Sequence, residues 1–178
     1  MTSATPLPLY AIGLGSNRRH VRFGDPRRVL LASRAALESD DIESDEIEPG
    51  DASPIVASAP IGPSRRRYAN AVALVASPLS PPEMLDRLKA IEAAFGRRRG
   101  QRWGARTLDL DILLWSEGAW SDAALTVPHA AMTVRDFVLG PLRMIAPAWR
   151  HPLSGQSVRQ LAARLSRAKP VDHGASAH

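Results

Sequence analysis

Residues 102–112 read RWGARTLDLDI, and they begin the most informative stretch of the sequence. Successive side chains of a β-strand point to opposite faces, so Asp109 and Asp111 share one face and the apolar residues between them share the other. We therefore predict a strand over residues 107–115 that packs one face on the core. On its other face the two carboxylates would lie about 6–7 Å apart along the strand.

A run of arginines just before these carboxylates suggests what the pair does. Without that run, an ordinary strand facing solvent would be the better interpretation of the pattern. Carboxylates that share a site repel each other unless a cation lies between them. Mg²⁺ suits such a pair, because it prefers hard oxygen ligands and keeps positions open for phosphate oxygens. Arginine binds phosphates through paired hydrogen bonds. We therefore predict a polyphosphate site that combines the two carboxylates with Arg97, Arg99, Arg102 and Arg106.

Composition limits the class of protein. The chain has 178 residues, which suggests one domain, and 44% hydrophobic with 23% charged residues excludes wholesale disorder. It has no cysteine, which excludes disulfides and thiolate ligands. No apolar run approaches the ~20 residues of a membrane span, and the first residues lack the pattern of a secretory signal. We expect a protein of the bacterial cytoplasm.

Two helix starts are recognisable from their capping residues. Asp25 can cap the helix that Pro26 opens, and Ser80 with Glu83 forms a capping box around two prolines. Two more helices are predicted, over residues 135–145 with a kink or interruption at Gly140 and Pro141, and over residues 157–165.

Three strands are predicted over residues 8–14, 68–76 and 107–115, with a short extended piece at 125–129. We interpret Gly13 and Gly15 as a tight turn that ends the first strand, because neither a dinucleotide-binding fingerprint nor a P-loop is completed. The acidic stretch 38–51 is interpreted as a solvated connection, and the proline-rich stretch 54–63 as a loop with a short edge strand.

These elements predict an α+β fold, a ferredoxin-like antiparallel sheet packed with helices. We expect a single domain over residues 8–167, with disordered termini at 1–7 and 168–178.

Several of these motifs resemble those of one known enzyme family. The segment RWGxRTLDLDI resembles the signature of the 6-hydroxymethyl-7,8-dihydropterin pyrophosphokinase family. Further similar motifs follow in family order across about residues 10–165: AIGLGSN, Tyr68-x-Asn70, Ile91-Glu92, LTVPH at 125–129, Arg135-x-Phe137 and Pro141-Leu142. The resemblance implies that the pterin hydroxymethyl oxygen attacks the β-phosphorus of ATP, that the diphosphate is transferred and that AMP leaves, in folate biosynthesis.

The resemblance also implies roles for individual residues. Two Mg²⁺ ions would be held by Asp109 and Asp111, which with Arg97, Arg99 and Arg106 would form the catalytic group. The pterin would be bound by Ser58, Pro60, Ile61, Tyr68, Asn70, Trp103 and Phe137. ATP would be bound by Glu92, Arg97, Arg99, Arg102, Arg106, Ile112, Thr126, His129 and Arg135. We expect a monomer that uses these two small molecules and binds neither nucleic acid nor a membrane.

Three alternatives are weighed against this assignment. A basic RNA-binding module would explain the sequence pI of about 10.6 and the arginine runs, but aromatic residues are only 5% and no RNA-binding motif is present. A metal-dependent nuclease or nucleotidyl transferase would normally need a third acidic ligand, and none is obvious. A paralogue that has lost catalysis is disfavoured because every catalytic position is filled.

Overall fold

The computed structural model describes residues 6–38, 47–59, 67–96 and 107–168. Its main sheet has five strands in the order β2-β4-β1-β5, with β3 also paired to β4, and all these pairs are antiparallel. The elements follow along the chain as β1 (Leu9–Ser16), α1 (Pro26–Glu38), β2 (Glu48–Ala52), β3 (Val56–Ser58), β4 (Tyr68–Ala76), α2 (Pro81–Ala94), β5 (Asp109–Trp115), β6 (Trp120–Ser121), β7 (Thr126–Val127), a 3-10 turn (Met132–Val134), α3 (Asp136–Ile145) and α4 (Val158–Ala168). This arrangement confirms the predicted α+β fold.

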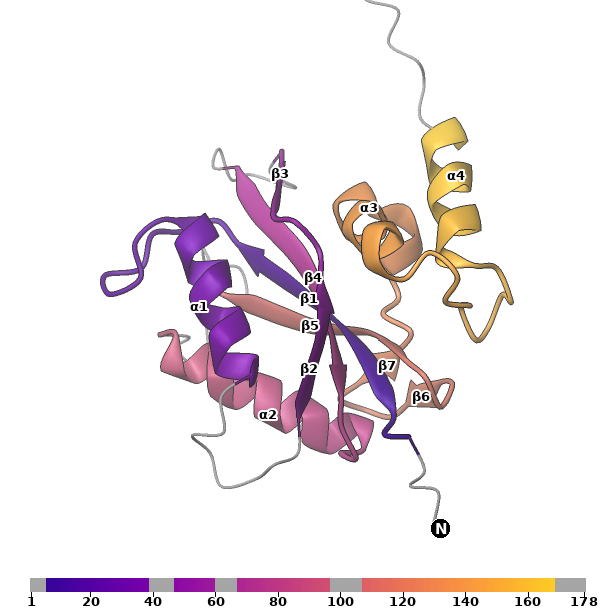
Figure 1. The fold of residues 1–178 in the computed structure, drawn as a ribbon, viewed down its shortest axis with the longest axis horizontal. Helices are drawn as coiled ribbons and strands as arrows, with labels where there is room; N and C mark the ends of the chain where they lie inside the picture. Colours follow the sequence, from indigo (N-terminus) through magenta and orange to yellow (C-terminus); the bar gives the residue numbers. More distant parts are fainter. Residues whose placement is uncertain (1–5, 39–46, 60–66, 97–106, 169–178) are drawn as a thin grey trace, which may run out of the picture.

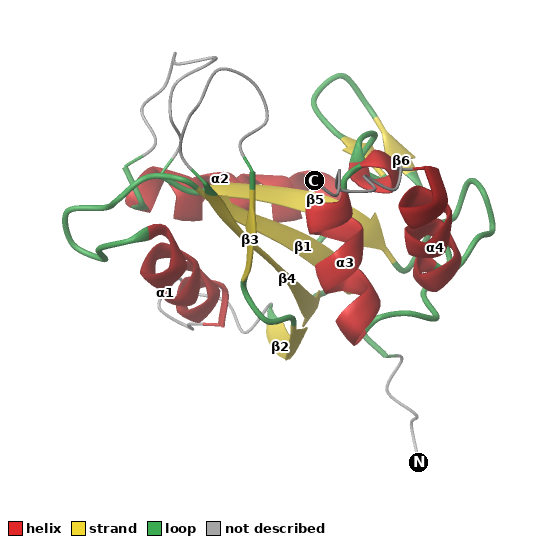
Figure 2. Cartoon of the chain, turned by 90° about the horizontal axis from the view of Figure 1, so that it is seen from above, coloured by secondary structure: helices red, strands yellow, loops and turns green. Residues whose placement is uncertain are grey.

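The helices cover the two faces of the sheet in pairs. Figure 1 shows α1 and α2 on one side of the strands and α3 with α4 on the other. Figures 1 and 2 both place α3 between the sheet and α4, in agreement with the contacts of α3 to β4 and to α4. Each face therefore has its own hydrophobic core, one centred on β1 and α2, the other on β4 and α3.

Local capping explains why the first two helices begin where they do. The backbone N–H of Arg28 donates to Asp25 Oδ1 at 3.1 Å, and the N–H of Ser80 donates to Glu83 Oε2 at 2.8 Å. Both bonds satisfy groups that a helix start would otherwise leave unpaired. The predicted caps are confirmed.

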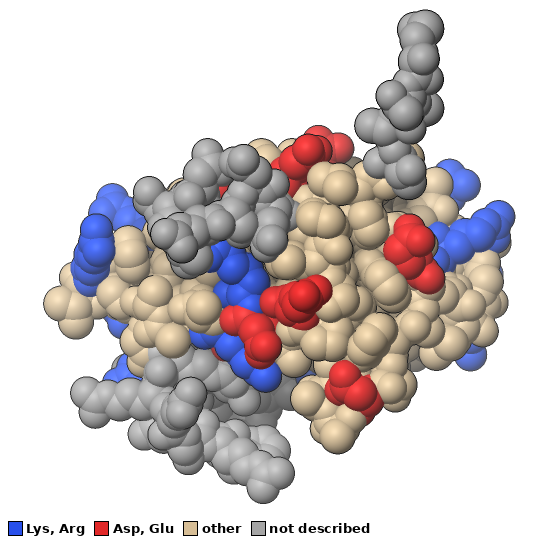
Figure 3. All heavy atoms as spheres, turned by 90° about the horizontal axis from the view of Figure 1, so that it is seen from below, with Lys and Arg blue, Asp and Glu red and all other residues tan. Residues whose placement is uncertain are grey.

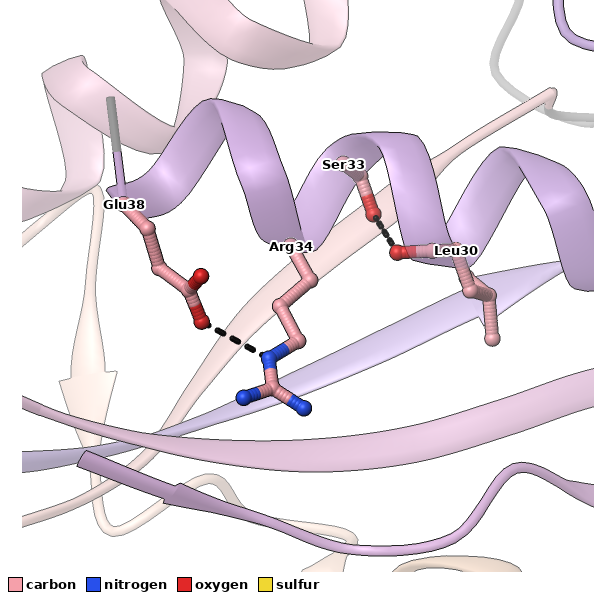
Figure 4. A network of polar contacts seen from close by, with 4 residues as sticks. All are labelled: Leu30, Ser33, Arg34 and Glu38. Atoms are coloured by element: carbon pink, nitrogen blue, oxygen red, sulfur yellow. Dashed lines mark hydrogen bonds and ion pairs between the residues drawn. The ribbon is translucent and has the colours of Figure 1, made fainter. Parts of the chain in front are cut away.

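Polar contacts also tie α1 along its length (Figure 4). Arg34 Nε lies 2.7 Å from Glu38 Oε1, one turn further along the helix. Ser33 is fully buried, and its hydroxyl donates to the carbonyl oxygen of Leu30 at 2.9 Å. A buried serine is tolerated here because its hydroxyl has a partner.

Two sequence-based interpretations were wrong. Gly13 and Gly15 do not form a turn but lie inside β1, which continues to Ser16. The acidic connection contains a strand, β2, whose pairing to β4 is irregular. A Cβ at Gly50 in β2 would stand only 3.0 Å from the carbonyl oxygen of Leu74, so this strand can pair closely only with glycine there.

Helix α3 runs from Asp136 to Ile145 without interruption, although Pro141 lies inside it. Pro141 and its neighbour Leu142 are both buried in the described structure, so tertiary packing holds the helix through the proline. None of the helices in the described ranges combines the length and the apolar character that crossing a bilayer requires.

Candidate active site

The two carboxylates of β5 lie on the face of the sheet that α3 and α4 cover. Asp109 and Asp111 are half-buried, whereas the alternate residues Leu110 and Ile112 are 4% and 2% exposed in the core beneath α1 and α2. The alternation predicted from the sequence is therefore confirmed. It ends at Leu113, an extra residue in the pairing of β5 with β1.

Strand register brings an amide to the same face as the carboxylates. Gly15 of β1 pairs with Asp109 on one side and with Asn70 of β4 on the other. Residues paired across antiparallel strands share a face, so Asn70 and Asp109 flank Gly15 in one row. Gly13 is flanked in the same way by Val72 and Asp111.

The amide of Asn70 is held in place by β3. Asn70 is 6% exposed, and its Nδ2 donates to Ser58 Oγ at 2.8 Å. Tyr68, two residues earlier on β4, lies on the same face, is half-buried and pairs with Ser58. These three residues, each predicted to bind the pterin, are therefore neighbours.

The start of α3 adds an aromatic ring and a cation. Phe137 packs partly buried against the core under α3, and α3 contacts both β3 and β4. The guanidinium of Arg135, at the N-cap of this helix, lies 5.9 Å from the centre of the Phe137 ring. At this distance the cation is attracted by the ring face. The cation and the ring therefore lie together at the start of α3, the helix that contacts β3 and β4.

His129 and Thr126 lie beside β5. The backbone N–H of His129 donates to the carbonyl oxygen of Leu113 at 3.1 Å, and its Nδ1 accepts the N–H of Ala131 at 3.1 Å. Nδ1 is thus occupied within its own turn, which leaves Nε2 as the ring nitrogen that a ligand could reach. Thr126 is exposed on β7, which packs against β5.

Two of the residues predicted to bind ATP have their side chains buried within the protein. Glu92 is 2% exposed, and its Oε1 accepts the N–H of Leu110 at 2.9 Å, which ties α2 to β5. Ile112 lies in the core on the opposite face from the carboxylates. The Ile112 side chain thus packs in the core and the Glu92 side chain ties α2 to β5, and contact of either residue with ATP stays a prediction.

The remaining predicted residues lie outside the described ranges: Pro60, Ile61, Arg97, Arg99, Arg102, Trp103 and Arg106. Their roles stay predictions from the sequence. Among the described residues, no group of three or more histidines, aspartates or glutamates could hold a metal ion. Asp109 and Asp111 supply the hard oxygen donors that Mg²⁺ prefers, so this pair fits such an ion when phosphate oxygens and water complete its shell.

Gly15 lies in the candidate site, although the sequence pattern predicts a turn there. This glycine lies at the centre of the row that joins the amide to the carboxylate. The alternation of β1 could have revealed it, because Tyr10, Ile12 and Leu14 set a period of two that continues to Ser16.

Comparisons with known proteins agree with this geometry. A family model described as 7,8-dihydro-6-hydroxymethylpterin-pyrophosphokinase matches residues 11–147. The 2-amino-4-hydroxy-6-hydroxymethyldihydropteridine pyrophosphokinase of Pseudomonas aeruginosa is 41% identical over 142 residues, which cover 79% of this chain and 82% of the relative. The protein of the same name from Synechocystis sp. is 47% identical over 100 residues, covering 56% of this chain and only 51% of the relative.

A solved structure shows the same fold at low sequence identity. The HPPK-DHPS triple mutant of Plasmodium falciparum, crystallised with SDX-DHP, superposes with a TM-score of 0.71 at 14% identity. The match covers 95% of this chain and 46% of that chain, so this chain corresponds to about half of the larger protein.

Proposed function

Because the chain belongs to the 7,8-dihydro-6-hydroxymethylpterin-pyrophosphokinase family, we propose that it transfers the diphosphate of ATP to 6-hydroxymethyl-7,8-dihydropterin in folate biosynthesis. The hydroxymethyl oxygen forms a bond to the β-phosphorus of ATP. The bond from that phosphorus to the oxygen it shares with the α-phosphorus breaks, and AMP leaves with the electron pair. The hydroxyl proton is lost to solvent or to a nearby base.

One observation carries the proposal: Asn70, Gly15 and Asp109 form a single row across three strands. A substrate that binds to the amide at one end of this row has its reactive group directed toward the carboxylates at the other end. Such fixed placement of two reactants accelerates a bimolecular transfer without any covalent step by the protein.

The pterin half of the site is formed by β3, β4 and α3. Tyr68 and Phe137 are the aromatic faces between which the flat heterocycle stacks, and Asn70 binds its polar edge. Stacking favours flat aromatic partners, and an amide both donates and accepts hydrogen bonds, as a pterin edge requires. Ser58 supports this half by orienting the amide through its hydroxyl.

The phosphate half of the site is formed by β5 and the segments beside it. Asp109 and Asp111 hold two Mg²⁺ ions, which when bound neutralise charge on the phosphates. In this proposal His129 and Arg135 donate to phosphate oxygens, and the positive charge of Arg135 stabilises the charge that develops there. The arginines predicted between residues 97 and 106 complete this half.

One face of the molecule carries charges of both signs. On the face that Figure 3 shows, acidic and basic side chains of the described residues adjoin one another. An RNA-binding module would instead present a continuous basic surface. We further propose that the protein acts as a monomer in the bacterial cytoplasm.

Isothermal titration calorimetry combined with product analysis tests the function. The full-length protein is titrated with a non-hydrolysable ATP analogue and Mg²⁺, then with 6-hydroxymethyl-7,8-dihydropterin. We expect both to bind, and with ATP itself we expect one AMP for each pterin diphosphate formed. Formation of ADP, or failure of the pterin to bind, would contradict the proposal.

A further inference from the structure

The two glycines of β1 that face the site have different surroundings. A Cβ built on Gly13 would stand 3.2 Å from a methyl carbon of Leu113, so a protein side chain already fills the space above it. Among the described residues, a Cβ on Gly15 would meet nothing closer than Asn70 Oδ1 at 3.7 Å and Asp109 at 4.0 Å. Gly13 thus makes room for the core, whereas the space above Gly15 is not taken by the core.

An acceptor oxygen lies beside the space at Gly15. Asn70 is 6% exposed as a whole residue. Among the described residues, the one hydrogen bond of its side chain is donated by Nδ2 to Ser58 Oγ. Its Oδ1 is the atom nearest to the Cβ position of Gly15. This oxygen accepts no hydrogen bond from the described residues, and it is not one of their fully buried unpaired atoms, so it stays open to a ligand that brings an N–H to this point.

We infer that Gly15 is a specificity-determining residue, whose missing side chain leaves the room that a flat, N–H-bearing heterocycle needs between the amide of Asn70 and Asp109. The inference rests on the proposed function and deepens it. Any side chain at this position would stand between the ligand and its acceptor. The sheet backbone itself thereby becomes part of the pterin site, although the sequence motif around Gly15 suggested only a turn.

The Gly15→Ala variant is a gentle test, because its methyl group would make ordinary van der Waals contacts of 3.7 and 4.0 Å. The protein should fold normally while the methyl group occupies the space meant for the ligand. Gly140→Ala is the matched control, since a Cβ at Gly140 in α3 would have no neighbour within 4 Å.

Pterin affinity is measured by calorimetry in the presence of Mg²⁺ and the ATP analogue, with steady-state KM and kcat and a thermal unfolding curve alongside. For Gly15→Ala we expect the Kd and KM for the pterin to rise about tenfold or more, the size of one lost hydrogen bond to a buried group. The Kd for the ATP analogue should change less than about twofold, and Gly140→Ala should match the wild type in both affinities.

The double variant Gly15→Ala/Asn70→Ala shows whether the methyl group acts through the amide. If it does, adding Gly15→Ala to Asn70→Ala weakens pterin binding far less than adding it to the wild type, because the acceptor is already gone. Full additivity of the two changes would contradict this.

Three further outcomes would overturn the inference. They are unchanged pterin affinity in Gly15→Ala, an equal loss of ATP affinity, and failure of Gly15→Ala to fold, since the last would show that the space belongs to the protein. A wild-type protein that does not bind the pterin would instead overturn the proposed function, and the inference with it.

Discussion

The two faces of the sheet are built from the same strands but differ in how far they are covered. Toward α1 and α2, β1 presents Tyr10, Ile12 and Leu14, which are all buried. Toward α3 and α4 it presents Ala11 and then two glycines. The first face is apolar along β1 as far as Leu14 and ends at the buried Ser16. The second is apolar at one end and carries the amide and the carboxylates at the other.

This difference separates stability from chemistry within one sheet. Large apolar side chains stabilise the fold through the area they bury, at about 25 cal/mol per Å². Small and polar residues add little to this stabilisation by buried area. The small ones leave room for a ligand, and the polar ones supply groups that bind it. We therefore expect substitutions on one face to change unfolding and substitutions on the polar end of the other face to change binding and turnover.

Replacing a carboxylate should have the largest effect. Under the proposed function, Asp109→Asn or Asp111→Asn removes one charged metal ligand beside the transferring phosphates, which should raise the barrier by several kcal/mol and lower kcat by about 10²-fold or more. Steady-state kinetics at saturating Mg²⁺ measures this, with thermal unfolding as the control for the fold. Near-normal turnover in either variant would refute the metal assignment.

A core substitution on the opposite face should produce the reverse pattern. Leu88 is fully buried in α2, so Leu88→Ala should lower the free energy of unfolding by about 2–5 kcal/mol through lost burial and a residual cavity. Urea unfolding measures the loss. The Kd values for pterin and ATP analogue, taken at a temperature where the variant is folded, should match those of the wild type. If they shifted as much as the stability, the two faces would not be separable.

Removing the amide should have a smaller and more selective effect. Asn70→Ala should weaken pterin binding by about 1–3 kcal/mol, because a polar group of the ligand is then left unpaired. Binding of the ATP analogue should barely change. Calorimetry with each ligand separates the two, and an equal loss of both affinities would show that Asn70 does not belong to the pterin half.

The smallest effect concerns pH and lies away from the site. His151, in the connection between α3 and α4, is 9% exposed, and burial lowers the pKa of its imidazole below the usual 6.5. The folded state then binds fewer protons than the unfolded state below about pH 6.5, so stability should fall as the pH drops through this range. Above about pH 6.5 the stability should be retained.

Comparing His151→Gln with the wild type isolates this contribution. Urea unfolding at several values between pH 5 and pH 8, a range set by the ordinary histidine pKa, should show a shallower decline for the variant. The decisive quantity is the slope of the free energy of unfolding against pH, because the substitution also changes stability by a constant amount at every pH. Parallel curves would show that His151 does not titrate differently on folding.

Local patterns were sufficient to predict much of the fold. Strand β4 occupies residues 68–76 as predicted, and the capping box at Ser80 marks the start of α2. Both depend on interactions within a few residues of sequence. Strand β2 was missed because Pro49 and Gly50 are poor strand formers, and its pairing with β4 is a long-range contact.

The candidate site divides in the same way. The shared face of Asp109 and Asp111 follows from alternation within one strand, so it could be predicted directly. The row that joins Asp109 to Asn70 depends on the register of three strands, which local sequence does not specify. Asn70 was identified through a family resemblance, and Gly15 was missed because that resemblance assigns no role to a residue without a side chain.

The bond from Leu110 to Glu92 has a consequence for association between molecules. Among the described strands β5 pairs only with β1, so its other edge presents backbone groups that could template a strand from another chain. The buried carboxylate of Glu92 already accepts the N–H of Leu110 on this strand. The strand that carries the carboxylates therefore has part of its hydrogen-bonding edge occupied from within, which protects it against aggregation by edge-to-edge pairing.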